Sequence, residues 1–288
     1  MRDERRMNLA TLKHIRYVAT ENPVTLAAFL LFTGFVFLAL FGPWIAPYDP
    51  LASSSEFALK PPSARHWFGT DSLGRDILSR IIVATRLDFG IAISAVAASF
   101  VIGSTLGSLA GFFGGWADRI IGRVADTIMA FPLFVLAMGI VAALGNTIAN
   151  IVIATAIINL PFYIRVARAE VNVRRGAGYV EAARLAGNSD LRVLALHVFP
   201  NVLPPMMVQI SLNMGWAILN AAGLSFIGMG VRPPQAEWGI MVAEGATHII
   251  SGEWWVALFP GAVLMLAVFT FNLLGDGLRD IMDPRMRT

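Results

Sequence analysis

Few residues of this chain have the types and spacing that catalysis requires. The sequence contains no HExxH metal site, no GxSxG nucleophile motif and no cysteine. The histidines are scattered rather than spaced as metal ligands: they are His14, His66, His197 and His248. We therefore predict that the chain is not an enzyme, with no catalytic residue and no metal site.

The lysines exclude a common way of binding nucleotides. A phosphate-binding loop of the form GxxxxGK[ST] needs a lysine directly after a glycine. The chain has only Lys13 and Lys60, and neither follows a glycine. We expect no cofactor in this chain, so another polypeptide must bind ATP if the chain takes part in an ATP-driven process.

A polar loop, residues 170–200, interrupts the otherwise apolar second half of the sequence. On a helix, Tyr179, Ala182, Ala183 and Ala186 would fall at i, i+3, i+4 and i+7. They would form one face of small side chains with an aromatic ring at its edge. Such a face lets another surface approach closely.

The residues after this face predict a sharp bend. Gly187 can adopt the positive φ that ends a helix, and Ser189 or Asp190 can cap the next helix. We therefore expect two short helices joined at an angle.

The loop also carries a recognisable motif. Glu181-Ala182-Ala183, three residues, Gly187, nine residues, His197, one residue and then Phe199-Pro200 resembles the loop by which membrane subunits of ABC importers engage their ATPase subunits. His197 stands where an apolar residue is usual, and Phe199 replaces a leucine. The alternative is an ordinary amphipathic linker between membrane spans. The resemblance implies a set of ATPase-coupling residues: Tyr179, Glu181, Ala182, Ala183, Leu185, Ala186 and Gly187.

Composition indicates a protein that spans the membrane several times. Of its 288 residues, 56% are hydrophobic and only 14% are charged, which is too apolar for a soluble domain. The first apolar run lasts about twenty residues and has no small-residue cleavage site, so it indicates an anchor rather than a removable signal. Lipid is therefore the expected surrounding of most of the chain.

Hydropathy and charge predict six spans with both termini in the cytoplasm. With this orientation, 16 of the 22 lysines and arginines lie inside and 6 outside, as the positive-inside rule requires. The polar loop is then cytoplasmic. The predicted spans are residues 24–46, 89–113, 120–144, 148–164, 202–219 and 254–275.

The spans divide the chain into three parts. Residues 1–22 form a cytoplasmic N-terminal segment, either a helix on the lipid surface or a disordered tail. Residues 23–87 hold the first span and an extracytoplasmic excursion. Residues 88–285 form a transmembrane permease core that contains the loop 170–200.

The first excursion contains Gly69-Thr70-Asp71 and Gly74-Arg75-Asp76, which is similar to a hallmark of the dipeptide, oligopeptide and nickel permeases. Thr70 or Asp71 can cap a helix that begins near Ser72. We favour a structural brace over a substrate-binding role. Residues 223–239, which form the second excursion, resemble the same group.

Two spans contain polar residues that need partners. In the third span, Arg123 and Asp126 lie at i and i+3 and can form an ion pair, which we prefer to a proton relay. In the fifth span, Gln209, Asn213 and Asn220 either line a translocation path or bond to neighbouring helices. In the second span, small residues recur every four positions and predict close helix packing.

Taken together, the motifs resemble the C-type permease subunit of dipeptide, oligopeptide and nickel importers. The resemblance implies an all-α, type I importer permease in the bacterial inner membrane. It also implies a homologous B-type permease, two ATPase subunits that bind ATP and Mg, and an extracytoplasmic binding protein as partners, with no nucleic acid. Peptides are the expected substrate; nickel chelates, glutathione or another small solute are alternatives, and an ion-gradient-driven carrier or a membrane hydrolase has lower weight.

Overall fold

The computed structural model describes residues 23–282, with side chains through residue 280. The N-terminal segment predicted for residues 1–22 lies outside this range. Within the described residues, the regular elements are helices, as predicted, and five of them are long and apolar enough to span a membrane. These are α2 (Pro23–Ile45), α3 (Ile77–Phe113), α6 (Ile148–Arg174), α9 (Phe199–Phe226) and α11 (Trp255–Met282).

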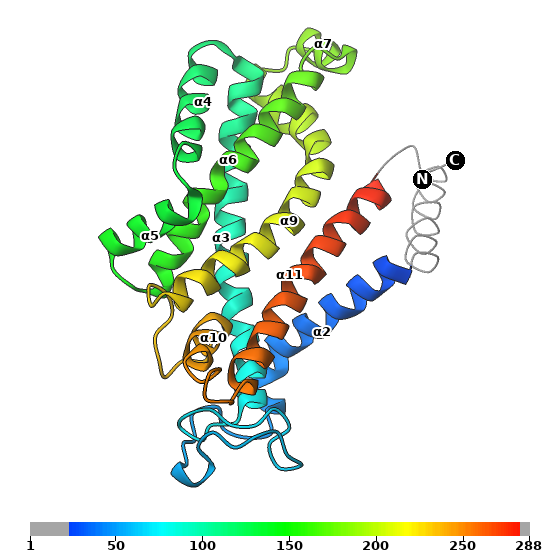
Figure 1. Cartoon of the computed structure of the whole chain (residues 1–288). Coiled ribbons are helices and arrows are strands. Elements are labelled where there is room, and N and C mark those ends of the chain that lie inside the picture. Colours follow the sequence, from blue (N-terminus) through cyan, green and yellow to red (C-terminus); the bar gives the residue numbers. More distant parts are fainter. Residues whose placement is uncertain (1–22, 283–288) are drawn as a thin grey trace.

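Two of these helices are much longer than hydropathy alone predicts. α3 begins at Ile77 instead of near residue 89, and α6 continues to Arg174 instead of ending near residue 164. The additional turns carry charged residues, which hydropathy assigns to loops although their backbone stays helical. α3 thereby runs the length of the fold, whereas α6 begins near the middle and lies beside the C-terminal part of α3 (Figure 1).

The third predicted span is not one helix. It consists of α4 (Gly115–Met129) and α5 (Leu133–Leu144), which meet at 91°. Pro132 stands between them and has no N–H to continue the hydrogen-bond ladder of α4. The bent pair makes a sixth crossing if it is counted as one span.

α3 and α6 form the centre of the fold, side by side in Figure 1. A Cβ added at Gly103 would lie 2.7 Å from Tyr163 Cβ, and one added at Gly107 would lie 2.3 Å from the carbonyl oxygen of Ile164. No real side chain fits at these distances. The four-residue repeat of small residues therefore brings the two backbones into contact, as predicted.

We expect Gly107→Ala to destabilise the protein by about 1–3 kcal/mol or more, because the new methyl group would force α3 away from α6. Gly90→Ala is the matched control in the same helix, since nothing lies within 4 Å of a Cβ at Gly90. The measurement is the thermal unfolding midpoint in detergent. Equal midpoints for the two variants would show that α3 and α6 are not in backbone contact.

Candidate functional site

The cytoplasmic loop folds into two short helices. α7 (Gly178–Leu185) and α8 (Asp190–Val193) are separated by Gly187, whose φ of +84° is the predicted left-handed conformation. A π-helical turn, Leu194–Val198, joins α8 to α9. Figure 1 places α7 at the tip of the fold, beyond the ends of α3, α6 and α9.

α7 has one side turned toward the protein and one toward solvent. Val180 is fully buried and Ala183 is only 8% exposed. Ala183 therefore belongs to the packing side rather than to the free face. The exposed coupling candidates are Tyr179, Glu181, Ala182, Leu185, Ala186 and Gly187.

Local hydrogen bonds fix the bend after α7. The Asn188 Nδ2 amide donates to the carbonyl oxygen of Ala183 at 2.9 Å, and Arg184 Nε donates to Asp190 Oδ1 at 3.0 Å. The Arg184 guanidinium also lies 5.2 Å from the ring centre of Phe112 in α3. Ser189 occupies the cap position of α8, but its side chain makes no capping bond. The loop is thus held against the membrane helices by α7 and its neighbours.

The free face of this loop exposes two large aliphatic side chains. Leu185 is 90% exposed, and Leu191 in α8 is 62% exposed. Isolated exposed leucines are common, but here both lie in one short loop that also exposes Tyr179, Ala182 and Ala186. Such a surface suits a partner that covers it.

The predicted path residues of α9 are only partly brought together. Gln209 Nε2 donates to Asn213 Oδ1 at 2.9 Å, and Asn213 is buried. Gln209 also lines a cavity of about 510 Å³ with Glu170, Arg174 and other residues of α6, α9 and α11. Asn220 lies about two turns further along and donates to the carbonyl oxygen of Trp216 at 2.8 Å.

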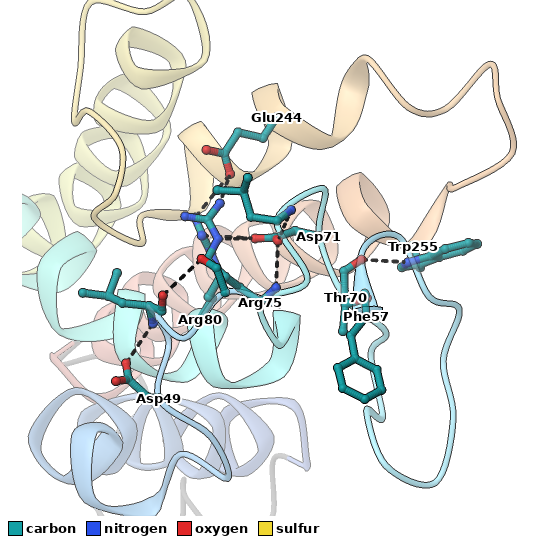
Figure 2. Close-up of polar contacts among 11 residues, drawn as sticks. Asp49, Phe57, Thr70, Asp71, Arg75, Arg80, Glu244 and Trp255 are labelled. Carbon is teal, nitrogen blue, oxygen red and sulfur yellow. Dashed lines mark hydrogen bonds and ion pairs between the residues drawn. The ribbon is translucent and has the colours of Figure 1, made fainter. Parts of the chain in front are cut away.

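At the opposite end, three buried charged residues of the first excursion join Glu244 in a network that we call the outer brace: Asp71, Arg75, Arg80 and Glu244 (Figure 2). Arg75 Nε donates to Asp71 Oδ2 at 2.6 Å, and Arg80 Nη1 lies 3.1 Å from the same oxygen. Both guanidinium groups also reach Glu244 Oε2, at 3.3 and 3.2 Å. Glu244 belongs to α10 (Trp238–Ala246), so the brace ties the first excursion to the helix that begins at the end of the second.

The start of α3 differs from the prediction. Asp76 caps the helix, not Thr70 or Asp71, and the first helical residue is Ile77 rather than Ser72. Asp76 Oδ2 accepts from the Ser79 backbone N–H at 2.8 Å. Asp71 Oδ1 accepts from the backbone N–H groups of Leu73 and Arg75, but these lie in a turn before the helix, and Asp71 Oδ2 pairs with Arg80.

Glu237 stabilises the start of α10 from a fully buried position. Its two carboxyl oxygens accept from the backbone N–H groups of Gly239 at 2.9 Å and Ile240 at 2.8 Å. Burial raises the pKa of Glu237 above its usual value. The Glu237-Trp238-Gly239 segment thus has a structural role on the extracytoplasmic side of the fold.

Sequence reasoning does not identify Glu244, because no local spacing links Glu244 to Arg80.

The ion pair predicted within the third span is wrong. Asp126 pairs with Arg165 of α6, whose Nη2 lies 2.8 Å from Asp126 Oδ1, and not with Arg123. A second pair joins the same two helices, since Arg168 Nη2 donates to Asp118 Oδ2 at 2.7 Å. The i, i+3 spacing allowed a local pair, but the antiparallel packing of α6 beside α4 supplies closer partners.

Potential metal sites are lacking from the described part of the chain: among residues 23–280, no group of three or more histidine, cysteine or acidic side chains could hold a metal ion. The acidic side chains described above are instead bonded to arginines or to backbone N–H groups.

Comparison with known proteins identifies the family. Residues 103–288 match the family "Binding-protein-dependent transport system inner membrane component", and residues 19–62 match "N-terminal TM domain of oligopeptide transport permease C". The chain is 44% identical over 264 residues to "Probable D,D-dipeptide transport system permease protein DdpC" of Escherichia coli K12, covering 92% of this chain and 88% of that protein.

Two further relatives cover nearly the whole chain. "Di/tripeptide transport system permease protein DppC" of Pseudomonas aeruginosa is 45% identical over 282 residues, which is 96% of this chain and 93% of that protein. "Glutathione transport system permease protein GsiD" of Pectobacterium atrosepticum is 39% identical over 297 residues, covering 99% and 98%. The chain therefore belongs to the family of binding-protein-dependent transport system inner membrane components, as one of its membrane-spanning permease subunits.

Proposed function

We propose that this chain is the C-type half of an ATP-driven peptide importer. It pairs with a homologous B-type permease to enclose the translocation path, and an extracytoplasmic binding protein delivers di- or oligopeptides to the outer face. The names of its relatives support peptides, and one of those names supports glutathione, itself a small peptide. Residues 88–285 form the transmembrane core that carries out transport, and the loop 170–200 within it contacts the ATPase subunit.

The free face of α7 is the observation that carries this proposal. The chain has no phosphate-binding loop, yet it presents Tyr179, Ala182 and Leu185 to the cytoplasm on a short, well-anchored helix. An ATPase subunit with a cleft for this helix would bury those side chains. A second ATPase subunit would receive the equivalent helix of the partner permease, and both would bind ATP and Mg.

Coupling follows from how α7 is attached. Closure of the two ATPase subunits on ATP moves each docked helix, and the attached spans then tilt between inward-open and outward-open arrangements. Glu181 is exposed on the first turn of α7, where it can make a polar contact at the edge of the cleft. Hydrolysis of ATP resets the pair.

Reconstitution of the complete transporter tests this function. The permease pair and the ATPase subunits are reconstituted in liposomes, and the binding protein is added on the opposite side of the membrane from the ATPase subunits. Uptake of a labelled dipeptide is measured with ATP and Mg supplied on the side of the ATPase subunits. We expect accumulation that ceases with a non-hydrolysable ATP analogue. Competition by unlabelled glutathione or a nickel chelate ranks the alternative substrates.

The ion-gradient carrier makes the opposite prediction. It requires accumulation in vesicles that hold an ion gradient and this chain without any ATPase subunit. Such accumulation would overturn the proposal, whereas uptake that depends on ATP and on the ATPase subunits would exclude the carrier.

A further inference from the structure

The surface formed by α4 and the adjoining end of α6 carries many charges for a membrane crossing. Asp118 and Asp126 of α4 pair with Arg168 and Arg165 of α6. The Arg165–Asp126 pair is still half-exposed, at 52% and 64% for the two side chains. This surface, which we call the charged wall, therefore remains uncovered in the isolated chain.

Two further arginines leave the charged wall with excess positive charge. Arg119 lies beside the ring of Trp116, with its guanidinium carbon 5.6 Å from the ring centre. Arg123 is exposed and has no ion-pair partner among residues 23–280. Both line a cavity of about 680 Å³ together with Asp118, Asp126 and Arg168. A space of this size falls within the range of small-molecule binding sites.

The position of the wall along α6 places it within or at the edge of the bilayer. At about 1.5 Å per residue, Arg165 and Arg168 lie about 25 and 30 Å from the start of α6 at Ile148. The hydrocarbon core is about 30 Å thick. The charged wall thus occupies the cytoplasmic part of the crossing.

A lipid-facing location does not fit this surface. A charge at the centre of the hydrocarbon costs about 2.5–3.5 kcal/mol and one nearer the edge costs less, so half-exposed ion pairs and two unpaired arginines are better placed beside water or protein than beside acyl chains. By contrast, exposed side chains along α2 and α11 are apolar, among them Leu30, Phe37, Met265 and Phe269.

We propose that the charged wall of α4 and α6 lines the cytoplasmic half of the translocation path, and that Arg119 and Arg123 bind the carboxylate groups of the passing solute. The inference rests on the proposed transport function and adds the site that meets the substrate. The polar lining of the path is then the α4–α6 surface and not the predicted Asn213, whose side chain is buried. The ion pairs hold the two aspartates, which leaves the two arginines free for an anionic group.

The absence of cysteine makes the wall directly testable. Single variants Arg123→Cys and Met265→Cys are assembled with the other subunits, and inside-out vesicles are treated with a membrane-impermeant sulfonate thiol reagent. We expect rapid labelling of Arg123→Cys, slowed at least fivefold when the transporter is trapped with ATP and vanadate. Met265→Cys, on the apolar surface of α11, should remain unlabelled in both states.

Three labelling outcomes would overturn the proposal. Absence of labelling at Arg123→Cys would mean that the wall is covered by the partner permease. Labelling that ATP and vanadate do not change would place the wall at the lipid headgroups, where anionic phospholipids attract arginine. Equal labelling at Met265→Cys would remove the contrast between the two surfaces. These readouts do not require peptide uptake, so they are separable from failure of the proposed function.

A transport measurement then tests the carboxylate contact. We expect Arg123→Gln to lower uptake of aspartyl-alanine about fivefold more than uptake of alanyl-alanine, because the former carries an additional carboxylate. Arg123→Lys keeps the charge and should restore the ratio, and Met265→Gln should not change it. Equal loss of both substrates in Arg123→Gln would show that Arg123 stabilises the helix instead of contacting the solute.

Discussion

Leu185→Glu is expected to abolish ATP-driven uptake while leaving the protein folded in the membrane. The side chain is 90% exposed, so the substitution removes almost no packing from the isolated chain. In the docked state the same side chain would be buried against an ATPase subunit, where a charge without a partner is strongly unfavourable. A central apolar contact of this kind contributes about 2 kcal/mol or more to binding, equivalent to about 30-fold in affinity.

The measurement is co-purification of the ATPase subunits with the permease pair, followed by ATP hydrolysis and uptake. Leu51→Glu is the matched control, because Leu51 is 51% exposed but lies in the outer excursion. Normal uptake by Leu185→Glu at normal expression would contradict the assignment of α7. Ala182→Trp is a second docking variant, whereas Ala183→Trp would test packing, since Ala183 faces the protein.

Arg80→Ala is expected to destabilise the protein by about 3–5 kcal/mol. Arg80 is 1% exposed, and its removal would leave Asp71 and Glu244 without one of their two arginine partners. Breaking a buried ion pair from one side costs this much because the remaining charge stays desolvated. The brace joins the start of α3 to α10, so we expect the outer excursions to separate first (Figure 2).

Thermal unfolding in detergent and protease sensitivity of the outer face measure this effect. Arg232→Ala is the control, because Arg232 is exposed on the same side of the membrane. The Asp71→Leu, Arg80→Met double variant should recover part of the lost stability, since it removes opposite charges together. An unfolding midpoint for Arg80→Ala equal to that of Arg232→Ala would show that the brace contributes nothing to the fold.

The parts of the fold that depend on local sequence could be predicted. Apolar runs fix most of the spans, since a helix needs about 20 apolar residues to cross the bilayer. Gly187 fixes the end of α7, because a positive φ favours glycine. The all-α class and the importer family followed from these features together with the motif around Glu181.

The incorrect predictions concern side chains whose partners lie outside the local sequence pattern. Asp71 resembles a helix cap, but its carboxylate closes a turn through Leu73 and Arg75 and pairs with Arg80, one turn into α3. Asp126 looked like the partner of Arg123, but α6 brings Arg165 to 2.8 Å. In each case the local spacing was permissive, and a contact from another turn or another helix determined the outcome.

The break in the third crossing was missed for a different reason. Hydropathy treats residues 120–144 as one apolar run, because it does not register the direction of the chain. Pro132 interrupts the hydrogen-bond ladder, and the two halves leave it at 91°. Hydropathy alone cannot distinguish one straight span from two shorter helices.

The glycine contacts between α3 and α6 also restrict how this subunit can move. If α3 slid along α6 by less than one turn, a residue with a side chain would replace Gly107 beside Ile164. There is no room for a side chain at that position. The two helices therefore cannot slide past each other, but they can tilt together as one unit. Since α3 starts in the outer brace and α6 ends at the loop that carries α7, any push on the cytoplasmic side must reorient the external surface at the same time.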